Sequence, residues 1–165
     1  MKKIILLLLS FVFLSCSKND EDMESRGGIT EETISYLHNN SSKKWKITHY
    51  YSNYEEQILD EALTNCMKDD VYIFYFDSNE CEVTFGDSSC YANYTDVVAE
   101  TAAAEYNFYS SQKKLYLSFG RGAYNDLNVQ TSWSITTSCL LLNPEKMIFT
   151  NGKDNSGVGI VFERI

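Results

Sequence analysis

The chain has 165 residues, of which 44% are hydrophobic, 14% are aromatic and one is proline. This composition is typical of one globular domain and excludes disordered, collagen-like and coiled-coil proteins. The formal net charge is −9, and the basic residues come as scattered pairs such as Lys43 with Lys44 and Lys113 with Lys114. Binding to nucleic acid needs clustered cations, so we expect no nucleic-acid partner.

The N-terminus has the pattern of a secretory signal. Lys2 and Lys3 precede residues 4–14, eleven positions of which only Ser10 is polar. This apolar segment is too short to cross the roughly 30 Å of a bilayer's hydrocarbon core. The sequence therefore predicts a signal peptide over residues 1–15.

The end of this segment, Phe13-Leu14-Ser15-Cys16, resembles the lipobox of bacterial lipoproteins. The resemblance implies that Cys16 is lipidated (palmitate or a similar acyl chain) and becomes the first residue of the mature chain. Several acyl chains would then hold the protein firmly on a membrane. The alternatives are an ordinary cleaved signal with a chance cysteine, or an uncleaved anchor helix.

Residues 16–28 are polar and acidic and end in two glycines, which is typical of a flexible tether. The stretch 17–22 also resembles the short acidic signal that sends some lipoproteins to the outer face of the outer membrane. We therefore predict an outer-membrane lipoprotein, exposed at the cell surface if that signal acts. Residues 29–165 form the single folded domain.

Four cysteines remain in the exported chain: Cys66, Cys81, Cys90 and Cys139. An even number in an oxidising compartment favours disulfides. Cys66 and Cys90 lie in polar, loop-like surroundings, which favours a bridge between them. Cys81 and Cys139 fall at apolar positions of strands and form either a second bridge or, as we favour, buried thiols. No CxxC or HxxxH spacing occurs, so we predict no metal site.

The first third of the domain contains two expected helices and one strand. Cap and first-turn residues predict a helix over Glu31–His38. Alternation then predicts a strand over residues 44–51, with one face made by Trp45, Ile47, His49 and Tyr51. Helical spacing of apolar residues predicts a second helix over residues 54–65.

The rest of the chain predicts strands separated by turn residues. The expected strands are 71–76, 80–85, 97–109, 114–119, 131–142, 146–150 and 158–164. The glycines of Gly120-Arg121-Gly122 are expected to form a hairpin turn between two of them. About eight sequential strands without long crossover helices predict an all-β fold, an antiparallel up-and-down barrel whose closure removes exposed edges.

Three stretches carry a family resemblance: Lys44-Trp45-Lys46-Ile47, residues 66–74 and Trp133-Ser134-Ile135. With the N-terminal signal, they resemble the small lipocalin-like lipoproteins of double-membraned bacteria, over about residues 34–165. The resemblance implies an eight-stranded barrel with Trp45 near its closed end and a Cys66 to Cys90 bridge. In lipocalins an arginine at the end of a strand lies over this tryptophan, and Arg164 is the candidate for that place here. Lys43 argues against it, because it departs from the lipocalin signature, which has glycine at this position.

The predicted inward face is rich in large apolar residues. We expect non-covalent binding of a small apolar or amphipathic ligand by a set drawn from this face: Trp45, Ile47, Phe85, Tyr106, Phe108, Leu117 and Trp133. The alternative is a filled barrel without ligand that acts as an interaction module for an envelope or cell-surface protein. We expect no cofactor and no catalysis, since His49, one of two histidines, falls at an inward strand position as a partly buried barrel residue.

Overall fold

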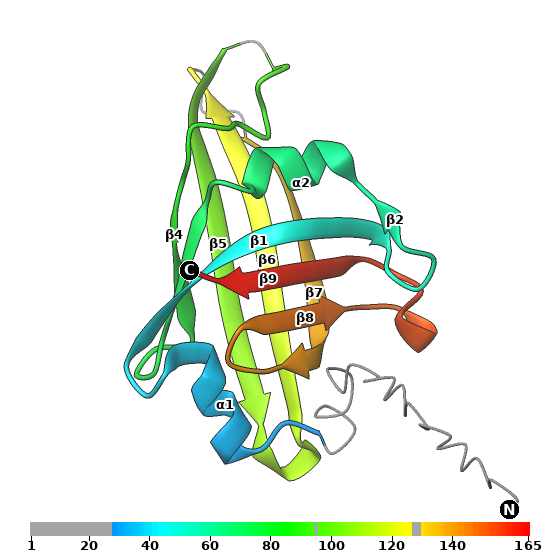
Figure 1. Cartoon of the computed structure of the whole chain (residues 1–165). Coiled ribbons are helices and arrows are strands. Elements are labelled where there is room, and N and C mark those ends of the chain that lie inside the picture. Colours follow the sequence, from blue (N-terminus) through cyan, green and yellow to red (C-terminus); the bar gives the residue numbers. More distant parts are fainter. Residues whose placement is uncertain (1–27, 95, 127–129) are drawn as a thin grey trace, which may run out of the picture.

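The structure, a computed structural model, describes residues 28–94, 96–126 and 130–165. Its main feature is a closed, all-antiparallel barrel of eight strands with two short α-helices (Figure 1). Each strand of the wall pairs with the next strand of the wall along the chain. The first, β1 (Ser42–Asn53), also pairs with the last, β9 (Gly159–Arg164), and closes the wall. The predicted all-β, up-and-down barrel is confirmed.

The elements lie close to the expected positions. The strands are β1 (Ser42–Asn53), the short β2 (Ile58–Leu59), β3 (Val71–Tyr75), β4 (Glu80–Thr84), β5 (Val97–Tyr109), β6 (Lys114–Asn125), β7 (Gln130–Leu142), β8 (Lys146–Thr150) and β9 (Gly159–Arg164). The helices are α1 (Glu31–His38) and α2 (Glu61–Met67), with 3₁₀ turns η3 (Ser110–Gln112) and η4 (Lys153–Asn155). The barrel wall consists of β1 and β3 to β9, with β2 added beside β1.

Helix α1 closes one end of the barrel and has the predicted bounds (Figure 1). Its capping box is reciprocal, because Thr30 Oγ1 accepts from the Thr33 amide while Thr33 Oγ1 accepts from the Thr30 amide. The indole nitrogen of Trp45 donates to the Leu37 carbonyl of α1 over 2.9 Å. Trp45 therefore lies at the closed end, as expected.

Strand β1 contains a β-bulge that reverses its inward and outward phase. Ile47 pairs with Phe162, whereas His49 pairs with Val161, so one extra residue lies between them. As a result Tyr50 is buried and His49 is exposed. The prediction that His49 shares the inner face with Trp45 and Ile47 is wrong, because the bulge interrupts the two-residue period.

The second helix begins later than predicted. The Asp60 carboxylate accepts a hydrogen bond from the Leu63 amide over 2.9 Å and caps α2, which then begins at Glu61. Upstream, Ile58 and Leu59 form β2 and pair with β1 instead of continuing a helix. The prediction of a helix over residues 54–65 is wrong in its first half for this reason.

Strand β6 runs straight through the glycines that were expected to form a turn. A Cβ atom at Gly120 would lie 2.9 Å from the Trp133 carbonyl oxygen, and one at Gly122 would lie 3.1 Å from Ser132 Cβ. The glycines therefore serve the close approach of β6 and β7, not a reversal of the chain. Consequently Arg121 falls at an inward position of β6 and is buried.

The barrel wall is longer on one side than on the other (Figure 1). Strands β5, β6 and β7 have 13, 12 and 13 residues, whereas β8 and β9 have 5 and 6. Strand β7 pairs with β6 over residues 130–138, but with β8 only from Ser138 onward. The long strands therefore extend past the rest of the wall at the end opposite α1.

The N-terminal predictions concern residues that the structure does not describe. The signal peptide over residues 1–15, Cys16 and the tether up to residue 27 lie outside the described residues, which begin at Gly28. Within the described ranges, no helix is long and apolar enough to cross a membrane.

Candidate functional site

The interior of the barrel is filled by aromatic side chains. Phe162 is at the centre of the cluster, with ring centroids 5.4 Å from Tyr72, 6.2 Å from Phe74 and 6.1 Å from Phe149. All four side chains have exposed fractions of 0%. None of these four residues belongs to the predicted ligand-binding set, although Tyr72 and Phe74 alternate in β3 as inward residues do.

Most of the predicted ligand-binding residues belong to this core. Trp45, Ile47 and Leu117 have exposed fractions of 0% and Tyr106 of 5%, and Phe108 and Trp133 are partly buried against the same cluster. Phe85 differs, because it follows β4 and is 38% exposed. The structure therefore brings six of the seven together as packed core residues.

A cation does lie over Trp45, but it is Lys43. Lys43 Nζ is 4.3 Å from the centre of the Trp45 ring and donates to the Tyr36 carbonyl of α1 over 3.0 Å. Arg164 instead pairs with Glu145 over 2.8 Å at the surface. Arg164 therefore does not take the place over Trp45 that the lipocalin pattern offers, and Lys43, which replaces the signature glycine, takes it.

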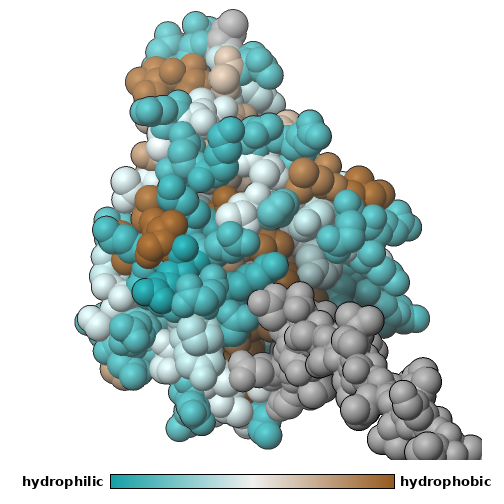
Figure 2. Space-filling model, viewed as in Figure 1, coloured by the Kyte–Doolittle hydropathy of each residue, from teal (hydrophilic) through white to brown (hydrophobic). Residues whose placement is uncertain are grey.

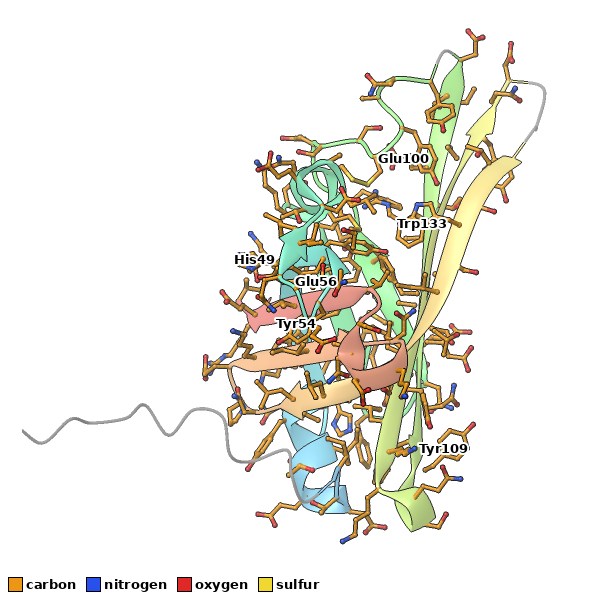
Figure 3. All side chains as sticks on the ribbon, turned by 90° about the vertical axis from the view of Figure 1, so that its right-hand side faces the viewer. His49, Tyr54, Glu56, Glu100, Tyr109 and Trp133 are labelled. Atoms are coloured by element: carbon orange, nitrogen blue, oxygen red, sulfur yellow. A yellow bond between two sulfur atoms is a disulfide. The ribbon has the colours of Figure 1, made fainter. Side chains whose placement is uncertain are left out.

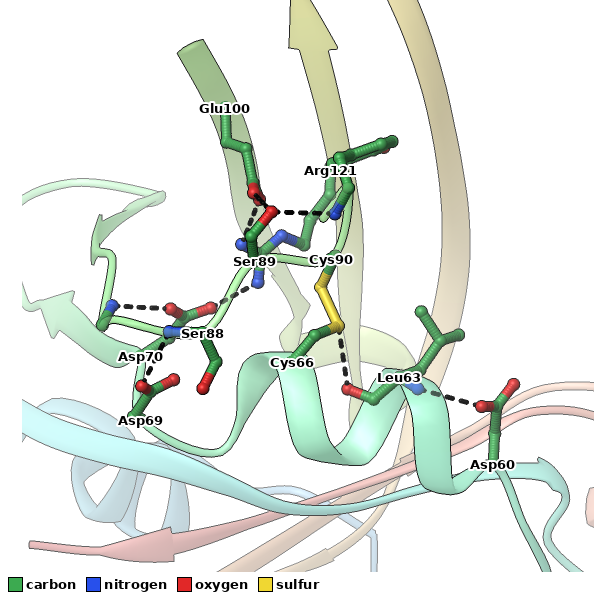
Figure 4. Close-up of a disulfide and its surroundings, with 12 residues drawn as sticks. Asp60, Leu63, Cys66, Asp69, Asp70, Ser88, Ser89, Cys90, Glu100 and Arg121 are labelled. Carbon is green, nitrogen blue, oxygen red and sulfur yellow. Dashed lines mark hydrogen bonds and ion pairs between the residues drawn. A yellow bond between two sulfur atoms is a disulfide. The ribbon is translucent and has the colours of Figure 1, made fainter. Parts of the chain in front are cut away.

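The open end of the barrel contains a buried charged triad of Asp70, Glu100 and Arg121 (Figure 4). Arg121 Nη1 donates to Asp70 Oδ2, and Arg121 Nη2 donates to Glu100 Oε2 over 2.9 Å. The side chains of Arg121 and Asp70 are both fully buried. The Phe85 ring covers the guanidinium, with 5.0 Å between ring centre and Arg121 Cζ.

Two further groups hold the Asp70 carboxylate. The Gly86 amide donates to Asp70 Oδ1 over 2.9 Å, and the Tyr72 hydroxyl donates to Oδ2 over 3.3 Å. Burial raises the pKa of Asp70, although the Gly86 amide and Arg121 oppose the rise. Burial also raises the pKa of Tyr72, so this hydroxyl stays a donor.

Three buried polar side-chain atoms in this region have no hydrogen-bond partner among the described residues: Arg121 Nε of the triad, the hydroxyl of Tyr91 and Asp69 Oδ1. The sequence missed Arg121 because its two glycine neighbours suggested a turn. The alternation in β6 could have predicted that Arg121 points inward. Leu115, Leu117 and Phe119 are buried at every second position, and Arg121 is the next position in this series.

A disulfide fastens the segment over the triad. Cys66 at the end of α2 is bonded to Cys90, with 4.8 Å between their Cα atoms (Figure 4). The predicted bridge is confirmed. In the same segment the Asp69 carboxylate accepts hydrogen bonds from the amides of Asp87 and Ser88 over 2.9 and 3.0 Å.

Cys81 and Cys139 are free thiols, so the alternative of a second bridge is not formed. Cys81 is buried, as predicted, whereas Cys139 is only partly buried. Burial raises the pKa of Cys81, and it raises the pKa of Cys139 to about 12. A thiol that stays protonated is a poor nucleophile. Within the described ranges, no group of three His, Cys, Asp or Glu side chains could hold a metal ion.

Two adjoining clefts, with volumes of about 300 and 430 Å³, lie on the outer wall formed by β5, β6 and β7. Their outward positions alternate with the buried Phe119 and Arg121 and carry small side chains. We call this surface the outer trough; it is formed by Thr101, Ala103, Gly120, Gly122, Ser132 and Ser134. Two exposed carboxylates, Glu80 and Glu105, line its second cleft.

Architecture and site together define the class of this protein: an eight-stranded antiparallel closed barrel with a buried aromatic core, compatible with a lipocalin-like fold. Comparison of the chain with protein family models, curated proteins and solved structures found no match. The evidence for the fold is therefore the strand topology, and the evidence for a function is the arrangement of side chains and clefts in this structure.

Proposed function

We propose that the protein is an exported, lipid-tethered barrel that binds another envelope protein through its outer trough and catalyses no reaction. The observation that carries the proposal is the contrast between inside and outside. The inward residues expected to bind a ligand are packed against each other, whereas the clefts of about 300 and 430 Å³ lie on the outer wall. Binding sites need concave space that is accessible from solvent.

The interior offers little room for a ligand. Small-molecule sites are cavities of roughly 300 to 1,000 Å³. Here Trp45, Ile47 and Leu117 have exposed fractions of 0%, and the Trp45 indole is already hydrogen-bonded to α1. A ligand at these side chains would have to displace a close-packed core.

The outer trough has the chemistry of a protein-binding surface. Gly120 and Gly122 have no side chain and Ala103 has only a methyl group, so a partner can approach the sheet closely at these positions. Ser132 and Ser134 supply hydroxyls that donate and accept hydrogen bonds. The carboxylates of Glu80 and Glu105 favour a partner with a basic residue at that end.

The face of the protein drawn in Figure 2 is largely hydrophilic, and its hydrophobic groups are separate from each other, which favours recognition by shape and polar contacts there. Large exposed hydrophobic residues such as Ile58 and Val98 come from distant elements, β2 and β5. These two residues therefore do not belong to one broad apolar patch that could serve as the binding surface.

The tether is tested by Cys16→Ala. If acyl chains on Cys16 hold the protein at the membrane, this variant is released into the soluble fraction of the envelope. The measurement is fractionation of the producing cells, with the wild-type chain as control. Retention of the variant on membranes would refute lipid anchoring.

The trough is tested by cross-linking in the producing cell. A photoreactive residue at the exposed position Ala103 should give one discrete adduct, and the same residue at His49, exposed on β1, should give none. Ala103→Trp fills the trough and should remove an adduct formed from the neighbouring Thr101 position, whereas His49→Trp should not. Equal adducts from both positions would contradict the proposal.

A second candidate is binding of a small amphipathic ligand at the open end. It is favoured by one observation: Arg121 Nε and the Tyr91 hydroxyl are buried without a protein partner. A polar ligand group or an ordered water would satisfy them. Native mass spectrometry of the protein purified from its own host distinguishes this candidate from protein binding at the outer trough. A bound small molecule that is lost in Arg121→Lys would favour ligand binding at the open end.

A further inference from the structure

Strand β7 has a free edge. On one side it pairs with β6 from Gln130 to Ser138, and on the other side β8 reaches it only from Ser138 onward. No strand in the described part of the chain pairs with residues 131–137 on that second side. Figure 3 shows β7 rising beyond β8 and β9 along this stretch, with Trp133 directed toward the barrel.

This edge lacks the protection that natural proteins give to free strands. Charged side chains, prolines and bulges normally block such edges against other chains. The sequence of β7, QTSWSITTSCLLL, contains no charged residue, no proline and no glycine. The only shift in register that β7 shows lies beyond the free part, between Cys139 and Leu141.

The upper part of β5 provides the contrast. It also extends past its neighbour, because β4 pairs with β5 only at Glu105 and Ala104. However, β5 carries the inward-pointing Glu100, which binds Arg121 and also the hydroxyl of Ser89 from the disulfide-fastened segment. An inward charge and a covering segment are two of the usual protections, and the free part of β7 has neither.

The free part of β7 is complementary to itself. Its centre is Ser134, and an antiparallel copy centred there sets Ser132 opposite Thr136 and Trp133 opposite Ile135. Small polar side chains thus meet on the outer face, and half-buried apolar side chains meet on the inner face. Cross-strand pairs of both kinds are favourable. Because β7 has no charged side chain, the two copies would not repel each other along this strand.

We propose that a second copy of this chain pairs antiparallel with residues 131–137 of β7, so that the two sheets join edge to edge around Ser134. Closed twofold symmetry uses the same surface on both copies and leaves no free edge. The new pairing would satisfy the backbone groups on this side of β7 and cover Trp133 and Ile135. A continuous wall of β5, β6 and β7 from both copies would result.

The geometry is tested by disulfide trapping in the full chain. Ser134→Cys places two thiols opposite each other across the twofold axis, where Cβ atoms of paired strands lie roughly 4.5 to 5.5 Å apart. It should give a dimer on a non-reducing gel that reductant removes. The matched control is Ser118→Cys, on the same outer face of the adjacent strand β6, which should stay monomeric on the gel, as should the wild type.

A charge variant tests the pairing without a covalent bond. Ser134→Lys sets two like charges opposite each other and should raise the dissociation constant roughly tenfold or more. Ser118→Lys adds the same charge away from the edge and should leave the dissociation constant unchanged. Native mass spectrometry and light scattering of the full chain over a concentration series measure both.

Two results would overturn the proposal. One is a wild-type chain that is monomeric up to its solubility limit. The other is a dimer that Ser134→Lys leaves intact and Ser134→Cys does not trap, because it would use another surface. Ala103→Trp separates this inference from the proposed function, since it fills the outer trough and should leave the dimer unchanged.

Discussion

The two ends of the barrel are built in different ways. At the closed end, α1 and the aromatic core bury Trp45 and Phe162 in apolar surroundings, with one hydrogen bond from Trp45 to α1. At the open end, a buried charged triad centred on Arg121 replaces the apolar packing, and a disulfide fastens the segment above it. The closed end therefore contributes mainly hydrophobic stability, and the open end contributes a specific polar arrangement.

The comparison shows where variation in sequence is tolerated. Apolar cores accept many side chains of suitable volume. A buried triad does not, because loss of one member leaves another charge buried without a partner. The long strands β5, β6 and β7 extend past the rest of the wall at the open end, so the triad and the disulfide also position the outer trough and the free edge.

The largest expected effect is at the closed end. Trp45→Ala should lower the free energy of unfolding by about 3 to 5 kcal/mol, because it leaves a cavity and the Leu37 carbonyl without its donor. Trp133→Ala, at the partly exposed tryptophan of the open end, should cost about 2 kcal/mol. Equilibrium denaturation measures both, and an unchanged midpoint for Trp45→Ala would contradict the assignment of this core.

Arg121→Met tests the charged triad and should cost about 3 kcal/mol at neutral pH, because Asp70 becomes a buried carboxylate without a cation. The pKa of Asp70 is already raised by burial, and loss of Arg121 raises it further. A carboxyl whose folded pKa exceeds its unfolded value stabilises the fold when protonated and loses this contribution as pH rises through the folded pKa. The difference in the free energy of unfolding between Arg121→Met and the wild type should therefore become smaller as pH falls.

The control for that pH dependence is the double variant Asp70→Asn with Arg121→Met. Without a carboxyl at position 70, part of the stability lost in Arg121→Met should be recovered at neutral pH. The remaining loss of stability should depend less on pH. Denaturation midpoints across a pH series measure both variants. A deficit of Arg121→Met that stays constant from neutral to acidic pH would show that the buried charge is not its cause.

Loss of the disulfide should lower the stability of the domain and loosen the open end most. Replacing Cys66 and Cys90 with serine should cost about 2 to 3 kcal/mol, since a bridge across this separation restricts the unfolded chain. Hydrogen exchange should rise more in the segment around residues 86–94 than in α1. Finding both thiols free in non-reduced peptides of the wild type would exclude the bridge.

The smallest expected effect concerns Asp69. Burial opposes ionisation of this carboxyl, but the amides of Ser88 and Asp87 outweigh it and hold its pKa below the usual value. A lowered folded pKa contributes stability above the usual carboxyl pKa that is lost as pH falls through the folded pKa. Asp69→Ala should therefore cost about 1 kcal/mol at neutral pH and progressively less in acid.

The matched control for Asp69 is Asp87→Ala. This substitution removes an exposed carboxylate but keeps the backbone amide that donates to Asp69. It should leave the midpoint within about 0.5 kcal/mol of the wild type at all pH values. Equal losses in both variants would assign the effect to net charge and not to the hydrogen bonds of Asp69.

Much of the fold could be predicted from local patterns. The cap residue Thr30 with the first-turn acids predicts the start of α1, and Asn39 with Asn40 predicts its end, since both signals act within one turn of the helix. Alternation predicts most strands, and the polar surroundings of Cys66 and Cys90 predict their bridge. The errors lie where a distant strand decides the outcome, as in the bulge before His49 and in β2, which competes with the start of the predicted helix.

The sequence by itself determined the all-β class and the succession of strands, because these follow from periodicity and turn residues. It also indicated the disulfide, because the surroundings of Cys66 and Cys90 are polar and loop-like. Tertiary structure alone decided that large inward side chains fill the barrel and that Arg121 meets Asp70 and Glu100. It also decided that β8 leaves part of β7 unpaired. Volumes, ion pairs and strand register depend on segments far apart in the chain, which no local pattern brings together.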